Sequence, residues 1–156
     1  MQKKYLALAL LVALFMTGCA KEPTVSTMII HKDGVVESYI VEEFAAPHYD
    51  AQELESSVLA NIASVNEQFE KPAIELTGYE LVEGILKATI EYQNADAYEE
   101  FNEETLYVGL LEDAVTAGYP VAAEIENDGY QVVVFSEPVD IRVPKKIVYV
   151  SDGIQT

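Results

Sequence analysis

Few side chains in this chain are suited to nucleophilic or metal-binding chemistry. It has one cysteine, Cys19, and two histidines, His31 and His48, which are expected to face solvent in loops. Zinc sites need several such ligands at close spacing, and no CxxC or HExxH pattern occurs. The chain also lacks GxSxG, Ser-x-x-Lys, GxGxxG and GxxxxGK[ST] patterns. The sequence therefore predicts no metal, no cofactor and no catalytic residue, and the chemistry of interest is that of Cys19.

Cys19 ends an apolar N-terminal segment. Residues 1–20 read MQKKYLALALLVALFMTGCA, in which two lysines precede the apolar run Tyr5–Phe15. The positive charge keeps that end on the cytoplasmic side while the apolar run enters the membrane. A helix that spans the hydrocarbon core needs about 20 residues. Because the run is shorter, we predict a cleaved signal and not a permanent span.

The segment resembles a bacterial lipoprotein signal peptide, with its lipobox at 16–19 (Met-Thr-Gly-Cys); Met16 stands where the family pattern prefers Leu. The resemblance implies cleavage before Cys19 and a thioether-linked diacylglycerol on its thiol. Two acyl chains give stable anchoring, whereas one gives marginal binding. We therefore expect a signal peptide over 1–18, a lipidated cysteine and short tether over 19–24, and one domain over 25–156. The expected location is the extracytoplasmic face of the cell membrane, to which diacylglyceryl-Cys19 anchors the chain.

The remaining 138 residues are strongly acidic. Seven Lys and Arg face 27 Asp and Glu, which gives a net charge of −20. Such a surface repels nucleic acid and anionic lipid, so no nucleic-acid partner is expected. It attracts cationic proteins or divalent cations, although acidity for solubility alone is also common in secreted proteins. A chain of this size without a second cysteine must be stabilised by a hydrophobic core.

Alternating hydrophobic patterns and turn residues predict hairpins, and helical patterns lie between them. This order favours an α+β fold, in which an antiparallel sheet built from hairpins carries two or three helices on one face. The expected strands are Val25–Ile30 and Val35–Val41 around the turn His31–Gly34, Ile74–Val82 and Ile85–Tyr92 around Glu83-Gly84, Val121–Ile125 and Tyr130–Phe135 around Asn127–Gly129, Val139–Val143, and Ile147–Val150.

Three helices are expected. Ala51–Phe69 has apolar residues every three or four positions and Asp50 as its N-cap. Ala97–Glu103 and Leu110–Ala117 are shorter, and Gly118 ends the latter. Leu106–Val108 fits either a helix or a strand.

Acidic residues gather on the second helix and on a turn. Glu99, Glu100, Glu103 and Glu104 repel one another at helical spacing, and calcium or a cationic partner would relieve this, but a solvated face also explains them. Residues 124–129 are similar to the first half of a calcium loop. Phe135 occupies the twelfth position, where that loop needs a glutamate, so a hairpin turn is favoured.

Tyrosines fall on the predicted strands, where half-buried packing or a saccharide- or peptide-binding face would explain them. They are Tyr39, Tyr79, Tyr92 and Tyr149.

Further segments are similar to small uncharacterised lipoproteins of Gram-positive gut anaerobes; they are Asp33–Ser38, Tyr49–Leu54, Ala95–Asn102, Glu112–Tyr119 and Lys146–Ser151. This resemblance implies one lipoprotein domain and carries no activity. We expect a non-enzymatic binding or accessory module with an unknown protein or glycan partner. One alternative is an acidic inhibitor or shield against cationic proteins such as muramidases. The other is a small cell-wall hydrolase with paired carboxylates.

Overall fold

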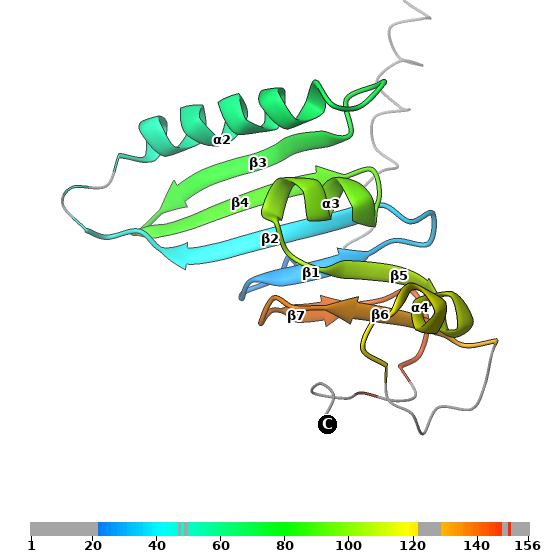
Figure 1. Ribbon diagram of the computed structural model, residues 1–156. Coiled ribbons are helices and arrows are strands. Elements are labelled where there is room, and N and C mark those ends of the chain that lie inside the picture. Colours follow the sequence, from blue (N-terminus) through cyan, green and yellow to red (C-terminus); the bar gives the residue numbers. More distant parts are fainter. Residues whose placement is uncertain (1–21, 47, 49, 122–128, 148–149, 151–156) are drawn as a thin grey trace, which may run out of the picture.

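The computed structural model describes residues 22–46, 48, 50–121, 129–147 and 150 (Figure 1). Over these residues a five-stranded, mostly antiparallel sheet has the order β3-β4-β2-β1-β7, and β5 and β6 form a two-stranded sheet. Three helices pack against the sheets, which confirms the α+β prediction. The elements are β1 (Thr27–Ile30), β2 (Val36–Glu43), α2 (Ala51–Asn66), β3 (Ile74–Val82), β4 (Ile85–Tyr92), α3 (Ala95–Asn102), β5 (Leu106–Leu110), α4 (Leu111–Ala117), β6 (Gln131–Phe135) and β7 (Asp140–Arg142).

The two hairpins expected in the N-terminal half are confirmed. In the β1–β2 turn the His31 amide donates to the Val35 carbonyl at 2.8 Å, and Gly34 takes the positive φ of +92° that glycine allows. The β3–β4 turn places both Glu83 and Gly84 at positive φ, 52° and 80°. This geometry matches the right-handed twist of the strands that the turn joins.

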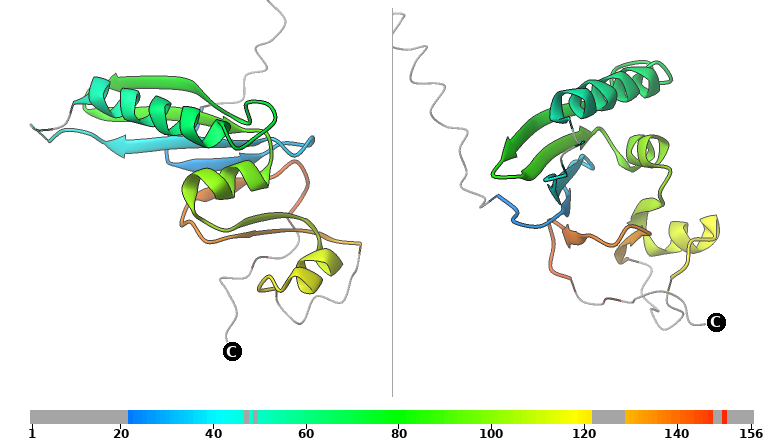
Figure 2. Two further views of the ribbon diagram at one scale, coloured as in Figure 1. Left: turned by 45° about the horizontal axis from the view of Figure 1, so that its top comes forward. Right: turned by 90° about the vertical axis from the view of Figure 1, so that its left-hand side faces the viewer.

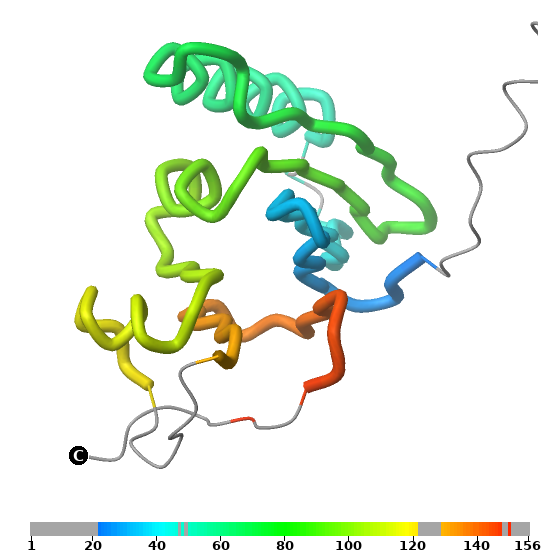
Figure 3. The backbone as a smooth tube through the Cα atoms, turned by 90° about the vertical axis from the view of Figure 1, so that its right-hand side faces the viewer, coloured from blue at the N-terminus to red at the C-terminus, as the bar shows by residue number. Residues whose placement is uncertain are grey.

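The helices and the two-stranded sheet lie on one side of the five-stranded sheet (Figure 2). Apolar side chains from both layers meet there and form the core. Among the members that are almost fully buried are Met28, Val36, Tyr92, Tyr98 and Leu106. Within the described residues no helix lies over the other side of the sheet (Figure 3).

Helix α2 begins as predicted and ends earlier than predicted. The Asp50 carboxylate accepts hydrogen bonds from the backbone amides of Gln52 and Glu53, as an N-cap does. The predicted end was Phe69, but the last helical residue is Asn66, and the amides of Gln68 and Phe69 bond three residues back in a tighter turn.

Asn66 also joins α2 to β3. Its Oδ1 accepts from the amides of Ala73 at 2.8 Å and Ile74 at 3.0 Å, and its Nδ2 donates to the Ile74 carbonyl at 2.9 Å. The side chain therefore provides the backbone at the start of the edge strand β3 with the partners that a neighbouring strand would offer.

Boundaries elsewhere differ slightly from those expected. Helix α3 starts at Ala95, two residues early, because Asn94 caps it by accepting from the Ala97 amide. It ends at Asn102, since Glu103 turns to φ 57°. Helix α4 begins at Leu111 instead of Leu110.

The C-terminal third contains pairings that the sequence did not predict. The expected strand Val121–Ile125 and its turn lie almost entirely outside the described residues, so that hairpin stays a prediction; the expected strand Tyr130–Phe135 is present as β6, which pairs antiparallel with β5. The ambiguous segment Leu106–Val108 is thus part of a strand. The expected strand Val139–Val143 is confirmed as β7, which pairs parallel to β1. The expected strand Ile147–Val150 lies partly outside the described residues.

Candidate binding surface

The side of the five-stranded sheet opposite α2 and α3 is its open face (Figure 2). Because side chains alternate along a strand, the buried residues of each strand identify the helix side and the intervening ones the open face. The open-face residues, taken from the strand registers, are Glu75, Gly78, Glu80 and Val82 of β3, Ile85, Lys87, Thr89 and Glu91 of β4, Glu37, Tyr39, Val41 and Glu43 of β2, Thr27 and Ile29 of β1, and Asp140 and Arg142 of β7.

Three carboxylates on this face stand side by side, and we call them the acidic row. Glu91 of β4 is directly opposite Glu75 on one side and Glu37 on the other. Neighbouring strands lie about 4.8 Å apart, so like charges in facing positions repel each other and destabilise the sheet. At one end of the row, His31 Nε2 lies 2.9 Å from Glu37 Oε2. A positively charged group placed over the row would therefore be favoured.

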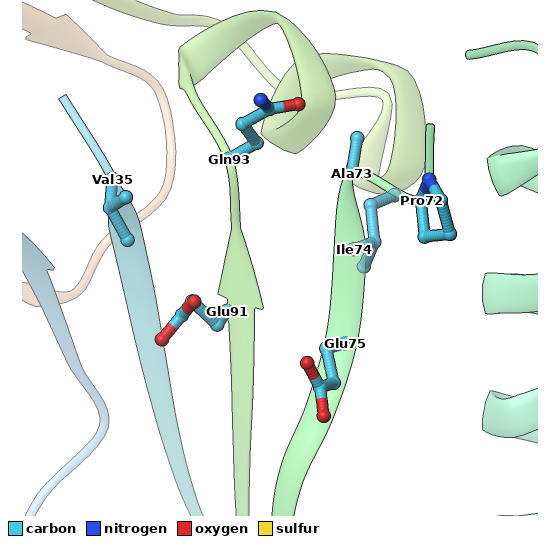
Figure 4. A pocket seen from close by; sticks show the side chains of 7 residues that line it. All are labelled: Val35, Pro72, Ala73, Ile74, Glu75, Glu91 and Gln93. Carbon is cyan, nitrogen blue, oxygen red and sulfur yellow. The ribbon is translucent and has the colours of Figure 1, made fainter. Parts of the chain in front are cut away.

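A groove of about 330 Å³ lies at this end of the sheet (Figure 4). Glu75 and Glu91 point into it from β3 and β4, and the rest of the lining is Val35, Pro72, Ala73, Ile74 and Gln93. Both carboxylates are exposed, so the groove offers hydrated acceptors with little apolar enclosure. Among the described residues no three His, Cys, Asp or Glu side chains are placed to hold a metal ion together. The groove therefore suits an ammonium or guanidinium group better than a bare metal ion.

The other half of the open face is less acidic. Lys87 Nζ lies 3.2 Å from Glu80 Oε1 in an exposed ion pair. Three aliphatic residues lie around this pair, and we call them the apolar corner: Val41, Val82 and Ile85. Val82 is 47% exposed and Ile85 is 37% exposed. Tyr39, between the two halves, has a raised pKa, caused first by burial and then by its hydrogen bond to Glu37.

The strongest polar network is buried on the opposite side of the sheet. The Tyr98 hydroxyl bonds to the Glu137 carboxylate, and Asn102 Nδ2 donates to the Tyr92 hydroxyl at 3.2 Å. The Tyr92 and Tyr98 rings meet edge to face at 5.1 Å. Burial raises the pKa of Tyr92 to about 12 and that of Tyr98 still further. The network joins α3, β4 and the segment before β7. The two tyrosine rings are almost fully buried, so they offer no surface for a ligand.

The acidic cluster expected on α3 has a structural use. Glu99 Oε1 accepts from the Leu106 amide at 2.9 Å, and Glu104 Oε2 accepts from Ser136 Oγ at 2.5 Å. Glu99 thus joins α3 to β5, and Glu104, in the connection between α3 and β5, bonds to the residue that follows β6. A calcium site there receives no support from the described residues.

The other candidates from the sequence have mixed outcomes. His31 and His48 are exposed as expected, and His31 also pairs with Glu37. Tyr39 and Tyr79 are partly buried, and the Tyr79 hydroxyl donates to the Ala51 carbonyl at 2.7 Å, but Tyr92 is fully buried. Three expectations lie outside the described residues: Cys19, most of the turn at 124–129, and Tyr149.

The acidic row is the feature that sequence reasoning missed. Glu37, Glu75 and Glu91 are far apart in the chain, and each looks like an ordinary exposed residue of an alternating strand. Their juxtaposition depends on β2 pairing with β4, a contact between two hairpins. The alternation of Glu91 with apolar neighbours predicts which face of the sheet it occupies. Only the register between the two hairpins brings Glu37, Glu75 and Glu91 side by side.

Comparison with known proteins finds no matching family model, no matching curated protein and no matching solved structure. Within the described part, which leaves out 1–21, no helix is long and apolar enough to cross a membrane.

Proposed function

We propose that this protein is a lipoprotein, anchored through diacylglyceryl-Cys19 on the extracytoplasmic face of the cell membrane. The observation that carries the proposal is the N-terminal segment: a cationic start, a short apolar run, and small residues before the only cysteine. The described domain, whose chain begins beside the sheet, is compatible with a tether attached there.

Labelled palmitate tests the anchor. The wild-type protein is expected to take up the label and to fractionate with membranes. The variant Cys19→Ser loses both the thiol that is acylated and the cleavage signal, so it is expected to take up no label and to accumulate as the uncleaved precursor. Wild-type protein that is unlabelled, free in the supernatant and cut elsewhere than before Cys19 would contradict the proposal.

We further propose that the anchored domain is a non-enzymatic binding or accessory module and that the open face is its binding surface. A sheet face over which none of the described helices lies, with a groove and an unbalanced row of charges, supports binding through surface contacts. Hydrolysis by two carboxylates needs one of them desolvated so that it holds a proton. The exposed pair Glu75 and Glu91 does not offer this.

Crosslinking on intact cells tests the binding role. A photoactivatable group at Thr89, the partly buried β4 residue beside Glu91 on the open face, is expected to capture a defined partner. The same group at Ala60, exposed on α2, is the matched control. Equal capture at both positions would contradict an open-face site, and turnover of cell-wall substrate by the purified domain would favour the hydrolase.

The acidity favours a second candidate function, inhibition of cationic proteins such as muramidases. A net charge of −20 steers a cationic protein towards the domain, and the steering weakens as salt is raised. The structure supplies a matched comparison. Replacing Glu37, Glu75 and Glu91 by Gln is expected to abolish inhibition at low salt. Replacing three exposed acids on the helix side, Glu53, Glu67 and Glu70, changes the net charge equally and is expected to preserve most of it.

Equal effects of the two triple replacements would show that total charge, and not the acidic row, is responsible. No muramidase inhibition by the wild-type domain at low salt would remove this candidate.

A further inference from the structure

The first described residues are fixed on the open side of the sheet. Ser26 Oγ accepts from the Val41 amide at 3.0 Å and bonds to the Val41 carbonyl at 3.2 Å, beyond the start of β1. Pro23 is buried, and the charge of Glu22 contributes to the raised pKa of Tyr39. The chain therefore reaches β1 from the side of the sheet away from α2 and α3 (Figures 2 and 3).

The chain between this point and the proposed lipid is very short. Cys19 and Glu22 are three residues apart, and an extended chain covers at most about 3.5 Å per residue, or about 10 Å in all. The polar headgroup region on each side of a bilayer is about 5–8 Å thick. Even at full extension Glu22 therefore stands only about 2–5 Å beyond the headgroups, which keeps the side of the sheet nearest the tether close to them.

Exposed aliphatic side chains lie on this same side. Val82 and Ile85 face each other at the end of the β3–β4 hairpin, and Val41 lies in the next row beside Lys87. Val25, in the segment that leads to the tether, is 52% exposed. Val41 is partly buried, and the exposed Glu43 lies opposite Ile85 at this end, whereas the acidic row lies at the opposite end of the strands.

We propose that the apolar corner and Val25 rest on the bilayer surface and are a second membrane contact beside the lipid anchor. The occupant is the headgroup region of a neutral, zwitterionic bilayer, because the acidic row would repel anionic lipid. The contact orients the domain with the open face down and α2 outward. It leaves the acidic row at the membrane surface, where it meets only partners that reach the headgroups. The inference rests on the proposed lipid anchor.

Depth-dependent fluorescence quenching tests this orientation in the full lipoprotein. Cys19 is the only cysteine and its thiol is used by the lipid, so a second cysteine can be labelled selectively. The positions are Ile85→Cys in the apolar corner and Ala60→Cys, exposed on α2, as the matched control. The protein is placed in phosphatidylcholine vesicles that carry nitroxide on the headgroup or shallow acyl chain, and the label is an environment-sensitive dye.

The label at Ile85→Cys is expected to be quenched at least about twofold more than that at Ala60→Cys, with a blue-shifted emission, since interfacial apolar groups lie 5–10 Å deep. Replacing phosphatidylcholine by a one-to-one mixture with phosphatidylglycerol is expected to reduce the difference. A lipoprotein that carries Val82→Ser and Val25→Ser beside the labelled Ile85→Cys is expected to stay membrane-bound through its lipid but to lose much of the quenching at position 85. Both positions are exposed, and thermal unfolding checks that the variant is folded.

Each contrary result has a separate meaning. Membrane-bound protein with equal quenching at the two positions overturns the orientation and leaves the anchor intact. Greater quenching in anionic vesicles overturns the proposed lipid preference. If the emission of the dye at Ile85→Cys is blue-shifted in native membranes but not in phosphatidylcholine vesicles, the apolar corner contacts a protein partner and the bilayer contact is overturned. Wild-type protein that stays in the supernatant overturns the anchor and the inference together.

Discussion

Replacement of Asn66 by Ala is expected to destabilise the domain more than any surface substitution on α2. It removes two acceptor contacts, at 2.8 and 3.0 Å, and one donor contact at 2.9 Å from the backbone of Ala73 and Ile74. Those residues are only 5% and 4% exposed, so water cannot easily replace the lost partners. Each unsatisfied buried group costs about 1–3 kcal/mol.

The net expectation is smaller than the sum of three such groups. Some relaxation will admit water, and Ala favours the helix over Asn by about 0.5 kcal/mol. We therefore expect the free energy of unfolding to fall by about 2–3 kcal/mol for Asn66→Ala. Asn66→Asp keeps an acceptor for both amides but places an oxygen against the Ile74 carbonyl, so its loss should be intermediate, about 1–2 kcal/mol.

Urea unfolding of a soluble form that begins at Lys21, followed by far-ultraviolet circular dichroism, measures these changes. Asn61→Ala, exposed on the same helix, is the matched control and isolates helix propensity. The reasoning is refuted if Asn66→Ala lies within about 0.5 kcal/mol of that control. It is also refuted if Asn66→Asp is the less stable of the two Asn66 variants.

The remaining predictions concern pH, turn geometry and the anchor. Burial raises the pKa of Tyr92 to about 12; between pH 10 and 12 the folded state keeps a proton that the unfolded state loses, so stability should fall by about 1.4 kcal/mol per pH unit. In urea unfolding across this pH range, the free energy of unfolding should fall less steeply for Tyr92→Phe than for the wild type. It should fall as steeply as in the wild type for Tyr130→Phe, because Tyr130 is exposed. Equal pH slopes for all three proteins would contradict the raised pKa of Tyr92. Glu83→Asn should stabilise the β3–β4 turn by about 0.5–1 kcal/mol, because Asn tolerates the positive φ of 52° better than Glu; an unchanged or lower midpoint of unfolding would count against this. The form beginning at Lys21 should unfold within a few degrees of the detergent-solubilised lipoprotein, since Cys19 precedes the described domain; a large gap in calorimetry would show that the lipid end stabilises the fold.

Local patterns in the sequence were sufficient to predict the first two hairpins and α2. Each depends on neighbours in the chain: the positive φ of Gly34 and Gly84, the Asp50 cap, and apolar spacing along one helix face. Such features are set by local backbone preferences and predict an element with little help from the rest of the fold.

Long-range pairing was not predictable in the same way. The pairing of β5 with β6 brings Leu106 opposite Phe135, and β7 returns to pair parallel with β1. No turn signal encodes either contact, because many residues separate the partners and the core decides between alternative registers. The acidic row was missed for this reason. Asn66 was missed because a side chain that bonds to a strand backbone leaves no pattern in spacing.

The position of β1 has a consequence for the order in which the domain is completed. This strand comes first in the domain but has β2 on one side and β7 on the other, and Thr27 pairs with Asp140 about 110 residues later. During synthesis, which starts at the N-terminus, one edge of β1 therefore stays unpaired until the residues of β7, near the end of the described chain, have been made. Once β7 is in place, the strand nearest the tether is held along both edges. A pull on that end must then shear two ladders of hydrogen bonds together and cannot peel a single edge strand away.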